Sequence, residues 1–225
     1  MTDTKLRNLD PAPKLDVSGF RKPEHDIAPI FLERWSPRSY TEEEIPDSAL
    51  MSCFEAARWA PSSTNQQPWR FVYCKRGGEN WENFKEAIQE RSRLWAKDAA
   101  AIVFFISKTA VFARGEHKIS RSHAFDTGAA WENFALQATM LGWAVHAIGG
   151  FDAKHAPRLL GIPEEGWQIH CAVTIGRRGD KSFLLDEFAA RELPNVRVPL
   201  NLLLMQGGFK PELTDFPPGT PGAPR

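Results

Sequence analysis

Two arginines and a serine near the start of the chain have a spacing that could bind phosphate. Arg34, Ser36 and Arg38 alternate in the segment RWSPRSY, so two guanidinium groups flank one hydroxyl. A guanidinium offers forked N–H donors that match phosphate oxygens, and charge-assisted bonds of this kind are roughly twice as strong as neutral ones. The same spacing is common on solvated surfaces, so these three residues indicate a site only together with others.

A polar loop is the second group that could contact a ligand. The run APSSTNQQPWRF begins at Ala60 and gathers hydroxyl and amide side chains immediately before an apolar segment. Such a run can be an ordinary connection between a helix and a strand, or it can line a polar ligand with donors and acceptors. The residues by themselves favour neither interpretation.

Glycines follow two further apolar segments. Gly149 and Gly150 end WAVHAIGGF, and Gly176 precedes Arg177 in IGRRGD. A missing side chain lets the backbone approach a planar ligand, whose ring nitrogen could accept from an exposed N–H; a turn at a strand end is the alternative that the glycines alone favour. Neither segment is GxGxxG and the chain lacks GxxxxGK[ST], so we predict neither a Rossmann dinucleotide site nor a P-loop.

Side chains that could perform chemistry on their own are missing from the sequence. The six histidines form no HxH or HExxH group, and no serine lies in a GxSxG elbow. Cys53, Cys74 and Cys171 lack CxxC spacing, so we expect neither a zinc site nor a disulfide framework. We therefore predict no catalytic side chain and no metal, and if the chain is an enzyme its chemistry would come from a cofactor.

The composition is that of an ordinary soluble protein. The 225 residues are 42% hydrophobic and 25% charged, and 28 basic residues balance 28 acidic ones. Zero net charge offers no general attraction for nucleic acid or anionic lipid. The first residues lack the apolar run of a signal peptide, and the most apolar window, 99–106, is too short for a membrane span. We expect a cytoplasmic protein without nucleic-acid or membrane partners.

The hydrophobic pattern places these groups at the ends of predicted elements. We predict helices over 46–60, 79–97 and 122–141, a short helix with Asp152 at its N-cap, and strands over 69–76, 99–108, 143–151 and 167–180. Because the strand over 99–108 is continuously apolar, helices must cover both faces of the sheet. The segment FARGEHKISRSH is expected to be a mobile loop over the site.

Both ends of the chain lack a core of their own. The first residues carry prolines and charges without periodicity, and the last are rich in proline and glycine. We expect an N-terminal arm over 1–29, a main domain over 30–205 and a C-terminal tail over 206–225.

Taken in order, RWSPRSY, APSSTNQQPWRF, the long helix opening with Asp126 and Gly128, GWAVHAIGGF and AVTIGRRGD resemble the nitroreductase family of FMN-dependent oxidoreductases. The resemblance covers most of residues 30–205. Its most specific element is Arg-x-Ser-x-Arg followed by Ala-Pro-Ser-x-x-Asn-x-Gln-Pro-Trp. It implies an α+β fold, a mostly antiparallel sheet wrapped by helices, and a homodimer with two FMN sites at the interface. The terminal arms would then lie on the partner subunit.

The resemblance also implies roles for individual residues. Arg34, Ser36 and Arg38 match positions that contact the phosphate and the flavin pyrimidine edge. The backbone of Ile148, Gly149 and Gly150 matches the segment facing flavin N5. The polar loop would help to hold FMN, partly that of the other subunit, through Pro61, Ser62, Ser63, Asn65 and Gln67. Gly176 would allow close approach, and the distal phosphate ligand would be Arg177, with Arg178 and Arg197 as alternatives.

A family member of this kind would take hydride from NAD(P)H onto flavin N5 and, by a ping-pong mechanism, reduce a nitroaromatic, quinone or enone. The alternatives are a specialised member that acts on halogenated aromatics or on the flavin itself, and a non-catalytic protein that stores or senses FMN.

Overall fold

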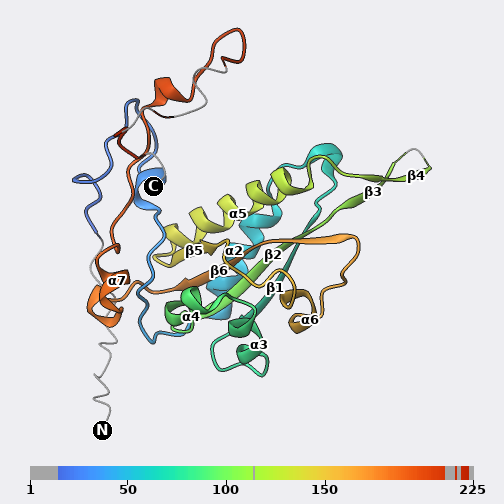
Figure 1. Ribbon diagram of the computed structural model, residues 1–225, viewed down its shortest axis with the longest axis horizontal. Helices are drawn as coiled ribbons and strands as arrows, with labels where there is room; N and C mark the ends of the chain where they lie inside the picture. Colours follow the sequence, from blue (N-terminus) through green and yellow to red (C-terminus); the bar gives the residue numbers. More distant parts are fainter. Residues whose placement is uncertain (1–14, 114, 211–215, 217–218, 223–225) are drawn as a thin grey trace.

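A four-stranded antiparallel sheet lies at the centre of the fold (Figure 1), in a computed structural model that describes residues 15–113, 115–210, 216 and 219–222. The strand order is β1-β2-β6-β5, and every neighbouring pair is antiparallel. The strands are β1 (Trp69–Lys75), β2 (Ala101–Lys108), β5 (Ala144–Ile148) and β6 (Trp167–Gly176). The predicted α+β fold with a mostly antiparallel sheet is therefore confirmed.

Strand β2 is the buried centre of the sheet, as its unbroken apolar sequence predicts. Every residue from Ala101 to Ser107 is buried, and β2 pairs with β1 on one side and β6 on the other. The register with β6 shifts where Phe105 pairs with Cys171 and Ile106 pairs with Ile169. His170 is the extra residue of this bulge in β6, and such a bulge bends its strand locally.

Helices cover both faces of the sheet, as predicted. On one face α2 (Asp47–Arg58) and α5 (His123–Met140) pack Leu50, Cys53 and Phe134 against the strands. On the other face α3 (Trp81–Glu86) and α4 (Glu90–Ala96) contribute two buried tryptophans. The apolar burial on both faces supplies the main stabilising term for the fold.

The single helix predicted over 79–97 is wrong, because the chain leaves helical geometry between α3 and α4. Ile88 forms an isolated β-bridge with Phe151, and the N–H of Gln89 donates to the carbonyl of Gly150 at 3.0 Å. These non-local bonds replace the helical ones and bring Gln89 next to the glycines that follow β5.

Two further predictions need correction. The short helix α6 (Ala156–Leu159) has His155 at its N-cap, because Asp152 instead accepts from the backbone N–H groups of Lys154 and His155, both at 3.1 Å. The segment expected to be a mobile loop over the site supplies most of a β-hairpin, β3 (Ala110–Ala113) and β4 (Glu116–Ile119), which projects away from the main body (Figure 1).

The N-terminal arm and the C-terminal segment lie side by side (Figure 1). Arg21 Nε donates to the carbonyl of Asn195 at 2.9 Å, and the N–H of Leu200 donates to Glu24 at 2.9 Å. Short elements in these and nearby segments are α1 (Ile30–Glu33), η1 (Ser63–Asn65), η2 (Lys181–Phe183), α7 (Asp186–Ala189) and η3 (Leu200–Leu202). The outer parts of the predicted arm and tail, 1–14, 211–215, 217–218 and 223–225, lie outside the described residues.

Two simple features accompany this fold. Cys53, Cys74 and Cys171 are all unpaired thiols. Within the part of the chain that the structure describes, no helix combines the length and apolar character needed to cross a membrane.

Phe134 lies in an aromatic cluster between α2, α5 and the sheet, where loss of its side chain should strongly lower stability. Phe134 is fully buried, and its ring centroid lies 5.3 Å from that of Phe54 and 5.5 Å from that of Phe105. We expect Phe134→Ala to lower the free energy of unfolding by about 3–5 kcal/mol, because it leaves a cavity that the rigid sheet cannot fill. Urea denaturation measures this change.

The matched control is Lys97→Ala, whose side chain is 48% exposed and which should change stability by less than about 0.5 kcal/mol. A Phe134→Ala loss as small as that of the control would contradict the packing described here.

Candidate functional site

The Arg-x-Ser-x-Arg segment is an extended loop that leads from α1 into the sheet. Helix α1 ends at Glu33, and Arg34 already has extended backbone angles. Arg21 Nη1 holds the start of the loop by donating to the carbonyls of Leu32 at 2.8 Å and Arg34 at 2.6 Å. The loop ends at Tyr40, which is buried and forms a β-bridge with Arg178. The loop therefore has a fixed course across the end of the sheet.

Two cavities adjoin along this loop. One of about 300 Å³ is lined by Arg38, His146, Ile148, Gly149 and Gly150, with Trp95 and Phe188 among its other walls. A larger one of about 850 Å³ is lined by Ser36 and Asn195. Arg38, His146 and Arg191 line both cavities. Because they share three side chains, the two form one site that extends from Ser36 to Gly150.

The glycine pair gives the smaller cavity its open floor. A Cβ added at Gly149 would meet nothing within 4 Å, so its backbone is accessible to a planar ligand. At Gly150 a Cβ would come 3.0 Å from Gln89 Oε1 and 3.7 Å from Ser92 Oγ, so this glycine keeps polar side chains close to the cavity floor. The sequence had indicated the glycines but not Gln89, because the break between α3 and α4 was not predicted.

His146 is a site residue that the sequence did not indicate. Its Nδ1 lies 3.0 Å from the carbonyl of Pro37, and its ring centroid is 4.6 Å from that of Trp95. Burial, with a smaller contribution from the charge of Arg38, lowers the pKa of His146 to about 4. The ring is therefore neutral at physiological pH, and since a carbonyl only accepts, the proton is on Nδ1 and Nε2 is a bare acceptor.

The polar loop is strained and lies outside both cavities. Thr64, Asn65 and Gln67 have left-handed φ angles of 49°, 56° and 47°, which are uncommon for residues other than glycine. The side chain of Asp126, at the start of α5, accepts from the N–H of Ser63 at 3.3 Å. No residue from Pro61 to Gln67 lines either cavity, so the loop lies outside the site of its own chain.

The family of the chain follows from its sequence as a whole. The profile of the nitroreductase family matches residues 32–93 and 81–177, which together contain the loop, the polar run and the glycine pair. The chain belongs to the nitroreductase family.

Individual relatives agree with this assignment. A solved structure described as an oxidoreductase containing FMN superposes with a TM-score of 0.82 at 41% sequence identity, and the match covers 84% of this chain and 96% of that one. An oxygen-insensitive NAD(P)H nitroreductase of Salmonella typhimurium is 24% identical over 224 residues, covering 80% of this chain and 99% of the relative. A protein of Archaeoglobus fulgidus assigned as an NADH dehydrogenase/NAD(P)H nitroreductase is 30% identical over 139 residues, covering 60% and 76%.

The arginines that could complete the site of this nitroreductase-family protein have different surroundings. Arg177 lies 4.2 Å over the Trp143 ring and pairs with Glu43 at 3.2 Å. It shares a cavity of about 440 Å³ with Arg34, but it does not line the two cavities that meet at Arg38. Gly176 packs instead on Tyr40, where a Cβ would come 2.7 Å from the ring.

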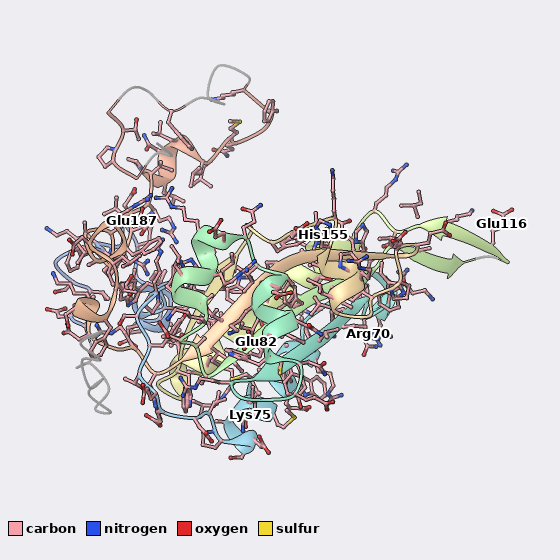
Figure 2. The ribbon with its side chains drawn as sticks, turned by 60° about the horizontal axis from the view of Figure 1, so that its bottom comes forward. Arg70, Lys75, Glu82, Glu116, His155 and Glu187 are labelled. Carbon is pink, nitrogen blue, oxygen red and sulfur yellow. The ribbon has the colours of Figure 1, made fainter. Side chains whose placement is uncertain are left out.

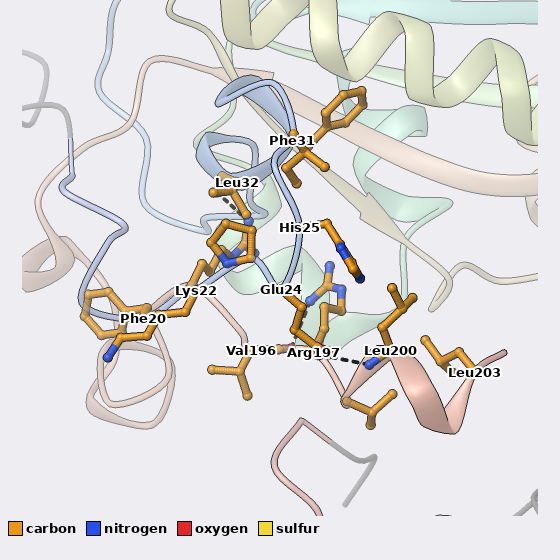
Figure 3. Close-up of a pocket in the computed structure, with 14 residues that line it drawn as sticks. Phe20, Lys22, Glu24, His25, Phe31, Leu32, Val196, Arg197, Leu200 and Leu203 are labelled. Carbon is orange, nitrogen blue, oxygen red and sulfur yellow. Dashed lines mark hydrogen bonds between the residues drawn. The ribbon is translucent and has the colours of Figure 1, made fainter.

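Arg197 approaches the loop from the C-terminal segment. Figure 3 shows it in the pocket between the N-terminal segment 20–32 and the C-terminal segment 196–203, together with His25, Leu200 and Leu203. Burial, and then the charges of Arg197 and Arg34, lower the pKa of Arg21 to about 10. Three cationic groups therefore lie close enough to act on one another at the start of the loop, which favours a bound anion there.

The lowered pKa of His146 gives the folded protein a specific acid sensitivity. Between pH 6.5 and about 4 the unfolded chain binds a proton at this residue and the folded chain does not, so the free energy of unfolding falls as the pH falls. Relative to His146→Gln, the unaltered protein should lose about 1–3 kcal/mol more between pH 7.5 and 4.5. Urea denaturation across this range measures the difference.

The exposed His25 supplies the control, since His25→Gln should keep the pH dependence of the unaltered protein. If the free energy of unfolding changed equally with pH in the His146→Gln and unaltered proteins, His146 would not be held neutral in the folded state.

Proposed function

We propose that this chain is an FMN-dependent oxidoreductase that takes hydride from NAD(P)H and passes it to an electron-poor acceptor. The observation that carries the proposal is the pair of adjoining cavities with Ser36 at one end, Arg38 in the shared wall and Gly149–Gly150 at the other end. The FMN-containing structure and the NAD(P)H nitroreductases among its relatives support it.

The residues present fit FMN. The open backbone at Gly149 can lie against the planar ring, Arg38 can donate to its pyrimidine edge, and Ser36 can donate to the phosphate. Arg34 lines the neighbouring cavity of about 440 Å³, where its Nε lies 3.7 Å from Glu132, and we propose that its side chain turns toward Ser36 to bind the phosphate as well. The charge of Arg197 acts on Arg21 at the start of the loop, whereas the guanidinium of Arg177 is held by Trp143 and Glu43, so we favour Arg197 over Arg177 as the distal phosphate ligand. Bound FMN would supply the hydride-accepting and hydride-donating chemistry for which the chain has no side chain of its own.

The chain's own residues would orient the reactants. The backbone of Ile148, Gly149 and Gly150 forms the wall against which the reactive edge of the ring would lie. Nitroaromatics, quinones and enones are the acceptor classes that we propose, each bound in turn after the nicotinamide has left. Because His146 is neutral, it adds no positive charge to the cavity wall that it shares with Arg38.

We also propose that two copies associate to complete the site. Large apolar side chains are exposed along α5 and at the end of α2, among them Phe125, Met140 and Trp59, and a partner subunit packed on these helices would cover them. The pocket of about 590 Å³ between the arms has mainly apolar walls (Figure 3), including Phe20, Phe31 and Leu203. The polar loop, which lies outside the site of its own chain, would then reach the cofactor of the partner.

The dimer gives a direct prediction for α5. We expect the double variant Phe125→Glu/Met140→Glu to convert a dimer into a monomer, because the charged side chains would be buried at the interface. Light scattering coupled to size exclusion measures the mass. Leu94→Glu, on the opposite face of the sheet, is the control and should remain dimeric. An unaltered protein that is monomeric while binding FMN would contradict the proposal.

The proposed activity is tested by the visible spectrum of the purified protein. The flavin should be FMN at about one per chain, lose its colour when NADH or NADPH is added without oxygen, and recover it when a quinone or nitroaromatic follows. Bound FMN that neither nicotinamide reduces would leave a storage or sensing protein. A colourless protein that takes up no added FMN would exclude the proposed cofactor.

The Arg-x-Ser-x-Arg loop gives a quantitative prediction for FMN affinity. Arg34→Ala and Arg38→Ala should each lower FMN affinity about ten- to a hundredfold, since each removes charge-assisted bonds worth about 1.5–3 kcal/mol. Quenching of FMN fluorescence measures the dissociation constants. Lys97→Ala, which removes a cation from the far end of α4, should leave them unchanged. Equal affinities in all three variants would show that the arginines are not part of the cofactor site.

A further inference from the structure

A carboxylate from the C-terminal segment holds the end of the Arg-x-Ser-x-Arg loop. Glu192 follows α7, which the buried Phe188 anchors against the core, and its side chain is only 3% exposed. Glu192 Oε1 accepts from the backbone N–H groups of Arg38 at 2.7 Å and Ser39 at 3.0 Å. Two loop N–H groups that no strand pairs are thereby satisfied by one oxygen.

The other oxygen of Glu192 interacts by charge alone. Oε2 lies 3.6 Å from Arg38 Nη1, and it is buried without a hydrogen-bond partner among the described residues. A buried carboxylate is stable only beside cations. Arg178 also interacts with Glu192 by charge, and Arg38 lies at ion-pair distance from it, so the position of the Arg38 guanidinium and the charge of Glu192 depend on each other.

Arg38 is the side chain through which this pair can act on a ligand. It lines both cavities, and its Cζ lies 5.9 Å from the centroid of the Trp95 ring. Glu192 lies behind it and lines neither cavity. A charge on Glu192 therefore alters the field in the site without contact with the ligand.

We propose that Glu192 is a positioning residue that fixes Arg38 in the wall between the two cavities and offsets part of its charge, thereby lowering the reduction potential of the bound flavin. This inference rests on the proposed function. A cation at the pyrimidine edge stabilises the negative charge that reduction places on the ring, and a nearby carboxylate weakens that stabilisation. Glu192 lies outside residues 32–177 that the family profile matches, so no motif indicates it.

The test is the reduction potential of the FMN-loaded variant Glu192→Gln, measured against a reference dye. Glutamine retains an oxygen for the two loop N–H groups and removes the charge, so FMN affinity should stay within about threefold. The equilibrium constant for two-electron reduction should rise about tenfold, which is about 30 mV. Glu82→Gln is the matched control: Glu82, labelled in Figure 2, pairs with Lys85 at 2.7 Å, neither residue lines the two cavities, and this variant should leave the potential unchanged.

A second variant tests the inference even if Glu192→Gln does not fold. Arg38→Gln, loaded with excess FMN, should shift the potential in the opposite direction. An unchanged potential in either FMN-loaded variant would overturn the role of Glu192, whereas failure of the unaltered protein to bind FMN would overturn the proposed function itself.

Discussion

The site depends on the hydrogen bonds that the backbone of one extended loop, residues 34–39, makes with the rest of the chain. Residues 34–39 connect α1 to the sheet without belonging to a helix or a strand, so their N–H and carbonyl groups need partners from elsewhere. Arg21 reaches the loop from the N-terminal arm, His146 from β5 and Glu192 from the segment after α7. Three distant parts of the chain thus meet at the loop, and the cavities beside it take their shape from these bonds.

Because of this dependence, segments outside the residues matched by the family profile are part of the site. The family profile ends at residue 177, yet Glu192 and Arg197 lie after that point and Arg21 lies before residue 32. The N-terminal arm and the segment after α7 both contribute charged groups to the loop. A partner subunit that covers the pocket between the arms would hold them in place, which connects the proposed dimer to the proposed cofactor site.

Local patterns in the sequence were sufficient for most of the fold and for part of the site. The apolar run of β2 and the helical spacing in α2 and α5 predicted those elements, since each reflects burial of neighbouring residues. The break after α3 was not predictable, because it depends on the bridge between Ile88 and Phe151. His146 and Glu192 were missed for the same reason: each acts through a contact with a loop more than a hundred residues away in the sequence. The resemblance drew attention to Arg177, and its contacts with Trp143 and Glu43 could not be inferred from spacing.

A crystal structure of the protein with FMN tests the central claim most directly, because it shows which groups contact the cofactor. The account predicts the ring against Gly149 and Gly150, Arg38 at its pyrimidine edge, and the phosphate beside Ser36 and Arg34. FMN bound instead in the cavity lined by Arg177 and Trp143, with Arg38 still paired to Glu192 and free of the cofactor, would contradict it.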